Sequence, residues 1–262
     1  MDDATETPPD ALSDPHAAVR RRAVLADSVP PGAVAAALRD PVWCVREAAA
    51  LAAGRFAGAD GAVRAALVAM TLHDPSPHVR LAAAGAAGPH VRPERDYGGA
   101  VAHRFERQRA RAARALGYVA PEFAEGAVRL LARTTADSHP KVRLASLRAL
   151  ARIEPAAVLP LVPVVVRRCA ETDPRVAAAA REVWLRVSAA PGAEPLCPLS
   201  AYPGTDDLAG VRGTLERLPA DHPLRCAWDA LPPVRDEGLT AHRFAKHLAA
   251  VCARVLNGVR TS

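Results

Sequence analysis

Aromatic residues are scarce in this chain. Phe, Trp and Tyr together make up 4% of its 262 residues, although 50% of the residues are hydrophobic. Ala, Val and Leu must therefore fill the core, because the bulky side chains that dominate many protein interiors are few. This composition suits closely spaced helices and argues against a β-sandwich.

Lysine is nearly absent, and so are long apolar runs. Lys141 and Lys246 are the only lysines, so the 34 basic residues are almost all arginine, and the formal net charge is +6. An arginine bias suits phosphate or carboxylate binding, but it also follows from a GC-rich coding sequence, which the many alanines favour. No run is long enough to span a membrane, and the acidic, polar N-terminus does not resemble a signal peptide. We expect a cytoplasmic protein that contacts no membrane.

Motifs of catalysis and metal binding are also missing. The five cysteines show no C-x-x-C spacing, which favours buried free thiols in a reducing compartment. There is no Gly-rich phosphate loop, no H-E-x-x-H and no G-x-S-x-G. We therefore assign no catalytic residue, no metal ligand and no cofactor, and the sequence leans away from an enzyme.

What the chain does contain is a repeated nine-residue motif. Asp137 to Ala145 reads Asp-x-x-Pro-x-Val-Arg-x-Ala, and Asp74 to Ala82 repeats it. Partial copies begin at Asp14, Asp40 and Glu171. Motif positions 46 and 80, 109 and 143, and 143 and 177 are each 34 residues apart. Six units result, four of them clear, and such self-similarity predicts a stack of supersecondary units.

Each unit predicts a pair of helices. The motif Asp suits a helix N-cap, and the Pro that follows it suits the first helical turn. Val142, Ala149 and Ile153 then recur at helical spacing. The small motif alanines allow neighbouring helices to approach closely. Because two short helices cannot bury both faces alone, each pair must stack on the next.

On these residues the chain resembles the HEAT-repeat family, in the short bacterial form also found in phycobilin-lyase-like proteins. A length of 34 residues is typical of tetratricopeptide repeats instead, but their Trp-Leu-Gly-Tyr pattern is absent. The resemblance covers residues 13–189. It implies a structural ladder in which motif Asp and Arg bond from one repeat to the next. The ladder residues would be Asp40, Arg46, Asp74, Arg80, Asp137 and Arg143, preceded by Asp14 and Arg20.

The predicted architecture is all-α, a right-handed α-solenoid of about five to six HEAT-like hairpins with a helical C-terminal extension. We expect a disordered acidic tail over residues 1–12, the repeats over 13–189, a linker loop over 190–206 and a helical cap over 207–262. Two prolines and three glycines in residues 88–99 argue against a regular second helix there. The next helix should run from about residue 100 to 119.

That next helix carries the candidate binding site. Arg104, Arg107, Arg111 and Arg114 are spaced three, four and three residues apart, which places them on one helix face. Four guanidinium groups on one face suit phosphates or an acidic peptide, although a solvated basic face is the simpler interpretation. The stripe adjoins the irregular segment, and Arg111 replaces a packing Ala. The three tryptophans, Trp43, Trp184 and Trp228, are expected to pack in the core or between repeats.

The sequence favours a non-catalytic scaffold that binds a protein partner, with an acidic surface, through a curved groove supplied by the second helices. One alternative is a nucleic-acid-binding protein, including the DNA-glycosylase type of HEAT-like protein. Another is a lyase-type HEAT enzyme. No motif of either enzyme class can be aligned beyond the shared Val-Arg.

Overall fold

The computed structural model describes residues 9–199, 208–231 and 241–259, and every regular element in these ranges is helical. The all-α prediction is confirmed. The α-helices are α1 (Ala17–Val24), α2 (Pro31–Ala37), α3 (Trp43–Ala53), α4 (Gly61–His73), α5 (Pro77–Ala87), α6 (Pro93–Val101), α7 (Glu106–Ala115), α8 (Ala124–Thr135), α9 (Pro140–Leu150), α10 (Pro155–Val158), α11 (Val162–Arg168), α12 (Pro174–Ser188), α13 (Leu208–Arg217), α14 (Pro223–Asp229) and α15 (Ala241–Val259). The 3-10 helices are η1 (Pro9–Leu12), η2 (Gly88–His90), η3 (Leu116–Tyr118), η4 (Pro121–Phe123), η5 (Leu159–Leu161) and η6 (Glu194–Leu199).

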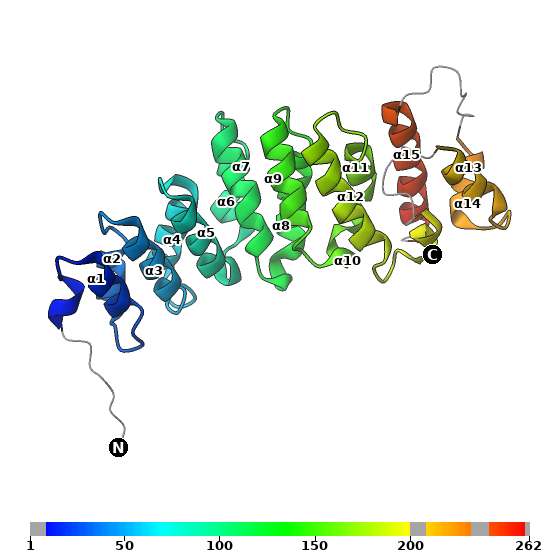
Figure 1. The fold of residues 1–262 in the computed structure, drawn as a ribbon. Helices are drawn as coiled ribbons and strands as arrows, with labels where there is room; N and C mark the ends of the chain where they lie inside the picture. Colours follow the sequence, from blue (N-terminus) through cyan, green and yellow to red (C-terminus); the bar gives the residue numbers. More distant parts are fainter. Residues whose placement is uncertain (1–8, 200–207, 232–240, 260–262) are drawn as a thin grey trace.

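The helices follow one another along an elongated molecule (Figure 1), with α1 at one end and α13 to α15 at the other. The first helix of each pair packs on the first helix of the next, in the order α1, α3, α5, α7, α9, α12. One pair of successive first helices differs. Helices α5 and α7 pack much less closely than the other pairs, and α7 packs on α4 instead. The basic residues discussed below lie at this junction.

The motif aspartates begin the units in a way that differs from our expectation. The helix N-caps are Val42, Ser76 and His139, so the prediction that the Asp itself is the N-cap is wrong. Each Asp instead accepts a hydrogen bond from the backbone N–H two residues further on, as Asp137 does from His139 at 2.8 Å. This is an Asx-turn, which leads the chain into the helix while leaving the carboxylate free for a second partner.

Small apolar side chains fill the core between the helices. The motif valines Val45, Val79, Val142 and Val176 are all fully buried. Ala48 and Ala145 are buried beside them, which lets the first helices approach closely. Tyr97 and Trp184 are among the few large side chains that are buried completely.

Residues 88–101 correct the sequence-based expectation. Instead of an irregular loop they form η2 and the α-helix α6, and the helix expected over residues 100–119 begins only at Glu106. Pro93 occupies the first turn of α6, where its missing N–H costs nothing. Tyr97 and Val101 are buried against neighbouring helices, and this packing outweighs the poor helix propensity of Gly98 and Gly99.

The two ends differ in part from the expected boundaries. Residues 9–12, expected in the tail, form η1 and pack on α1, whereas residues 1–8 lie outside the described residues. Within the expected linker, η6 buries Leu196 and Leu199, and residues 200–207 are outside the described part. Helix α15 packs closely on α11, which is the second helix of its pair, and therefore covers α11 near this end of the molecule.

Candidate functional site: a basic hollow at a break in the ion-pair ladder

Ion pairs join successive units along the described chain. A motif arginine of one unit meets a carboxylate that begins the next unit. The pairs are Arg20–Asp40 at 2.7 Å, Arg46–Asp74 at 2.9 Å, Arg109–Asp137 at 2.6 Å and Arg143–Glu171 at 3.0 Å. Among the predicted ladder residues, Arg20, Asp40, Arg46, Asp74, Asp137 and Arg143 therefore lie in such pairs, whereas Asp14 accepts a hydrogen bond from the backbone N–H of His16. Arg109 and Glu171 were not in the predicted set, although the spacing of 34 residues from Arg109 to Arg143 marks the position of Arg109.

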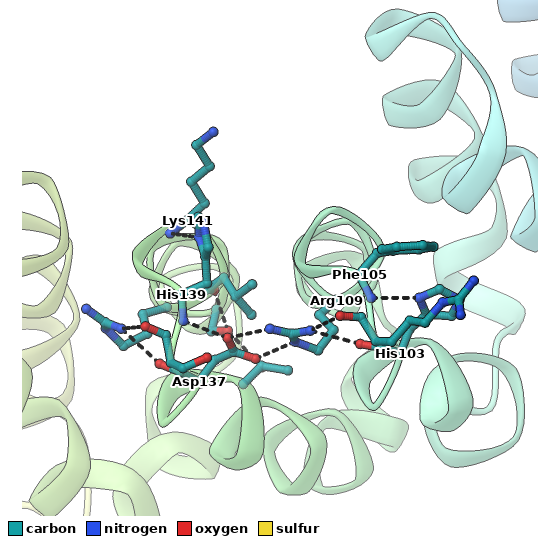
Figure 2. A network of polar contacts seen from close by, with 12 residues as sticks. His103, Phe105, Arg109, Asp137, His139 and Lys141 are labelled. Carbon is teal, nitrogen blue, oxygen red and sulfur yellow. Dashed lines mark hydrogen bonds and ion pairs between the residues drawn. The ribbon is translucent and has the colours of Figure 1, made fainter.

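Figure 2 shows how completely one of these pairs is bonded. The Nε and Nη2 atoms of Arg109 donate to the two carboxylate oxygens of Asp137, and Nη1 donates to the backbone carbonyls of His103 and Arg104. Burial alone raises the pKa of Asp137, but the bonds from Arg109 and from the backbone of His139 outweigh burial and hold that pKa below its ordinary value. Such a pair is structural, because its hydrogen-bonding capacity is already used.

The ladder breaks at Arg80. By position its partner in the next unit should be residue 103, which is His103 instead of an acid. Nη1 of Arg80 donates to the carbonyls of Asp74 and Pro75, as in the other units, but its Nε is buried without a hydrogen-bond partner in the described residues. The nearby carboxylate of Asp74 is already bonded to Arg46. Arg80 is therefore a ladder arginine without its carboxylate.

Further cations surround this unmatched arginine. A hollow of about 370 Å³ lies between α7 and α9. Its lining includes the cations Arg80, Arg107, Arg111, Arg114, Lys141 and Arg148, and one acid, Glu106. Within the described residues, the side chains of Arg107, Arg114, Lys141 and Arg148 have no hydrogen bond or ion pair. Arg111 is anchored, because its Nη1 donates to the carbonyl of Leu72.

The guanidinium groups at the junction repel one another. The pKa of Arg111 is lowered from its ordinary value, first by burial and then by the charges of Arg80, Arg107 and Arg114. The pKa of Arg80 is lowered by burial and by Arg114. These groups remain cationic at neutral pH, so the repulsion is a cost that a bound anion would relieve.

The predicted arginine stripe is correct only in part. Arg107, Arg111 and Arg114 lie on α7 and line the hollow, but Arg104 precedes the helix, and its guanidinium stacks over the Phe105 ring at 4.6 Å. Sequence reasoning missed Arg80, Lys141 and Arg148 as members of the site. The repeat register contains a signal for two of them, since Lys141 and Arg148 stand 34 residues after Arg107 and Arg114.

Two less polar hollows continue from the basic one. The first, of about 310 Å³, lies between α5 and α7 and shares Arg80, Arg111 and Arg114 with the basic hollow. The second is lined by Trp43 of α3 and by the start of α5, and it shares Pro77 and His78 with the first. These hollows are lined mainly by α3, α5, α7 and α9, which are the first helices of their pairs. We expected the binding groove on the second helices.

The tryptophans differ in their surroundings. Trp43 is 45% exposed, so it is not a core residue. Its ring does stack on the His78 ring of the next unit, with centroids 5.1 Å apart, as expected for packing between repeats. Trp184 is buried, as expected. Trp228 is half-buried and meets Phe244 edge-on at 6.4 Å.

Several other features bear on the class of site. Among the described residues, no group of three or more His, Cys, Asp and Glu side chains is placed to hold a metal ion, and none of the helices has the length and apolar character to cross a membrane. The five cysteines are free thiols; Cys169 and Cys252 are buried, whereas Cys197 and Cys226 are exposed, contrary to our expectation.

Comparisons with known proteins identify no family. No family model matches the sequence, and no curated protein matches it. The comparison with solved structures matches two crystal structures of engineered proteins. One is 15% identical over 96% of this chain and 94% of its own, with a TM-score of 0.36. The other is 17% identical over 91% of this chain and 70% of its own, with a TM-score of 0.37. Scores this low establish neither a shared family nor a shared function.

Proposed function

We propose that this chain is a non-catalytic scaffold, a right-handed α-solenoid of HEAT-like repeats, that binds an acidic segment of a protein partner. The observation that carries the proposal is the break in the ladder. The other motif arginines, Arg20, Arg46, Arg109 and Arg143, each pair with a carboxylate. Arg80 and its neighbours Arg111 and Arg114 have no carboxylate partner among the described residues. A carboxylate supplied by a partner would complete the pattern that the rest of the molecule follows.

The shape of the surface supports an extended segment as the partner. The basic hollow and the two less polar hollows share lining residues, so they form one track from α9 across α7 and α5 to α3. Leu81 is 48% exposed along this track, and the Trp43 ring is exposed at its end. A segment with acidic residues at one end and apolar residues at the other would match both parts.

Nucleic acid is the second candidate, because six cations around one hollow also suit phosphates. The distribution of charge favours the protein segment. The ladder arginines on either side are paired with carboxylates, so the unmatched ladder charge is confined to one junction instead of continuing along the molecule. A bound strand would need such a track of cations.

A peptide-display selection on the full chain tests the proposal. We expect acidic peptides with neighbouring apolar residues to be enriched, and the double variant Arg107→Glu with Arg111→Glu to lose that enrichment by about tenfold or more, because it replaces two attractive charges by two repulsive ones. The matched control is Arg21→Glu with Arg22→Glu, which makes the same charge change on exposed positions of α1.

Two results would count against this function. Equal enrichment on the arginine variant and on the wild type would remove the basic hollow from the binding site. Selection of no acidic peptide, together with binding of a single-stranded oligonucleotide that weakens steeply as salt rises, would favour the nucleic-acid alternative.

A further inference from the structure

The number of unmatched cations at the junction exceeds what one carboxylate satisfies. In the ladder, one guanidinium meets one carboxylate, as Arg46 meets Asp74 with two hydrogen bonds. At the junction, Arg80, Arg111 and Arg114 line two adjoining hollows together, and Asp74 is already engaged. A group with more than one negative charge would balance this site better than a single carboxylate.

Donors are available on these side chains. The Nε of Arg80 is buried and has no partner among the described residues. The side chain of Arg114 has no hydrogen bond or ion pair there either. Arg111 is held in place through its bond to the carbonyl of Leu72. Arg107, Lys141 and Arg148 stand further along the same hollow and add positive charge. The arrangement therefore combines a fixed cation with cations that are free to bond.

We propose that this junction binds a phosphomonoester, namely a phosphorylated serine or threonine in the partner segment, with Arg80, Arg111 and Arg114 around the phosphate. The inference rests on the proposed function, because it specifies the acidic group of that segment. A phosphomonoester carries close to two negative charges at neutral pH and has three strong acceptor oxygens, which suits several guanidinium groups at once.

The neighbouring surface favours a phosphorylated side chain over free phosphate or a nucleic-acid strand. The hollow between α5 and α7 leads from the arginines past Leu81 and His78 toward Trp43. Residues that flank the phosphorylated one can occupy this less polar track. Inorganic phosphate would leave it empty, and a phosphodiester carries only one charge for each phosphate.

The mutual repulsion of the arginines supports the same conclusion. Burial is the largest cause of the lowered pKa of Arg111, and the charges of Arg80, Arg107 and Arg114 lower it further, so these charges act on one another within the site. A dianion would interact favourably with all of them together. The geometry of the hollow and the missing ladder carboxylate carry the inference independently of this effect.

The test uses the full chain and three peptide libraries with random flanking residues, in which the central residue is phosphoserine, serine or glutamate. At about 0.15 M salt, where exposed charges are largely screened, we expect phosphoserine peptides to bind about tenfold more tightly than glutamate peptides. Their binding should strengthen between about pH 5 and pH 7, because the second phosphate ionisation has a pKa near 6. Glutamate peptides are already ionised over most of this range.

Variants assign the effect to the junction. Arg114→Gln should reduce the preference for phosphoserine to about threefold or less, because one cation of the set is lost, whereas Arg133→Gln on α8 neutralises an exposed arginine elsewhere and should leave the preference unchanged. Circular dichroism of each variant checks the fold. An undiminished preference in Arg114→Gln would overturn the site.

The remaining outcomes separate this inference from the proposed function. Equal binding of glutamate and phosphoserine peptides overturns the phosphate site and leaves the acidic-segment function intact. Retention of none of the libraries overturns both. Direct binding of inorganic phosphate or AMP to the chain, with no peptide retained, overturns the phosphorylated side chain as the source of the phosphate.

Discussion

Each ladder arginine that has its carboxylate bonds to atoms of two units at once. Arg46 donates to the backbone carbonyls of Asp40 and Pro41 in its own unit and to the carboxylate of Asp74 in the next. The side chains of both partners are largely buried, with 14% of Arg46 and 6% of Asp74 exposed. Removing one partner would leave the other charge partly buried and unmatched, which is costly.

Acid should weaken the ladder. The pKa values of Asp40 and Asp137 lie below the ordinary 3.8, so their contribution to stability is present above that value and is lost as the pH falls toward the lowered values of the folded state. Asp137→Asn should lower the free energy of unfolding by about 1.5–3 kcal/mol at neutral pH, because it removes hydrogen bonds to a charged group. It should also flatten the dependence on pH below about 4.

Urea unfolding of the wild type and of Asp137→Asn, from neutral pH to below about pH 4, measures the effect. Asp27→Asn is the matched control, because the Asp27 carboxylate is fully exposed in its ion pair with Arg55 and should contribute little. Identical pH profiles for Asp137→Asn and Asp27→Asn would contradict a stabilising role for the ladder.

At the scale of elements, close approach between segments depends on particular small residues. A Cβ atom added to Gly88 would lie 2.0 Å from the carbonyl oxygen of Tyr118, so η2 and η3 touch through their backbones at this point. Gly85, one turn earlier in α5, has no atom within 4 Å of the same added position apart from its chain neighbours and the backbone of its own helix. The two glycines therefore have opposite roles.

Alanine at these two sites should have opposite effects. Gly88→Ala should destabilise the protein by about 1–3 kcal/mol, because backbone atoms must move to admit the methyl group. Gly85→Ala should stabilise it by about 0.5–1 kcal/mol, because alanine loses less conformational entropy in a helix. Thermal unfolding compares the two, and a stabilised Gly88→Ala protein would refute the close approach.

For the whole molecule, the contacts are mainly between neighbouring units. Helix α3 packs on α1 and α5, whereas α11 packs on α12 and α15 near the other end. Proteins built in this way have stabilities that depend on local units and their interfaces instead of on one shared core. Loss of a core side chain should therefore have an effect that fades with distance along the row.

Hydrogen exchange tests this expectation. Val45 in α3 and Val165 in α11 are both buried, and truncation of either to Ala should cost about 2 kcal/mol. Val45→Ala should lower amide protection in α1 to α4 more than in α11 and α12, and Val165→Ala should do the reverse. Equal loss of protection throughout the molecule in both variants would indicate a single cooperative core.

The repeat register was readable from the residues alone. The spacing of 34, the motif valines and the acids at positions 40, 74 and 137 are local features, and they predicted helical units and most of the residues that form ion pairs. The N-cap role of the Asp and the irregularity of residues 88–99 were predicted wrongly, because Asx-turn geometry and the packing of Tyr97 prevailed over propensity.

The amino-acid sequence by itself determined which residues repeat, and hence which arginine has no acid to meet, since His103 stands where Asp or Glu stands in the other units. Only the tertiary structure decided where the unmatched charge gathers. Helix α7 packs on α4 and less closely on α5. At this junction Arg80 lies beside Arg111 and Arg114, and Lys141 and Arg148 line the same hollow. Arg104 lies outside the hollow, over the Phe105 ring. The physical reason is that convergence of side chains depends on long-range helix packing, which spacing along one helix does not specify.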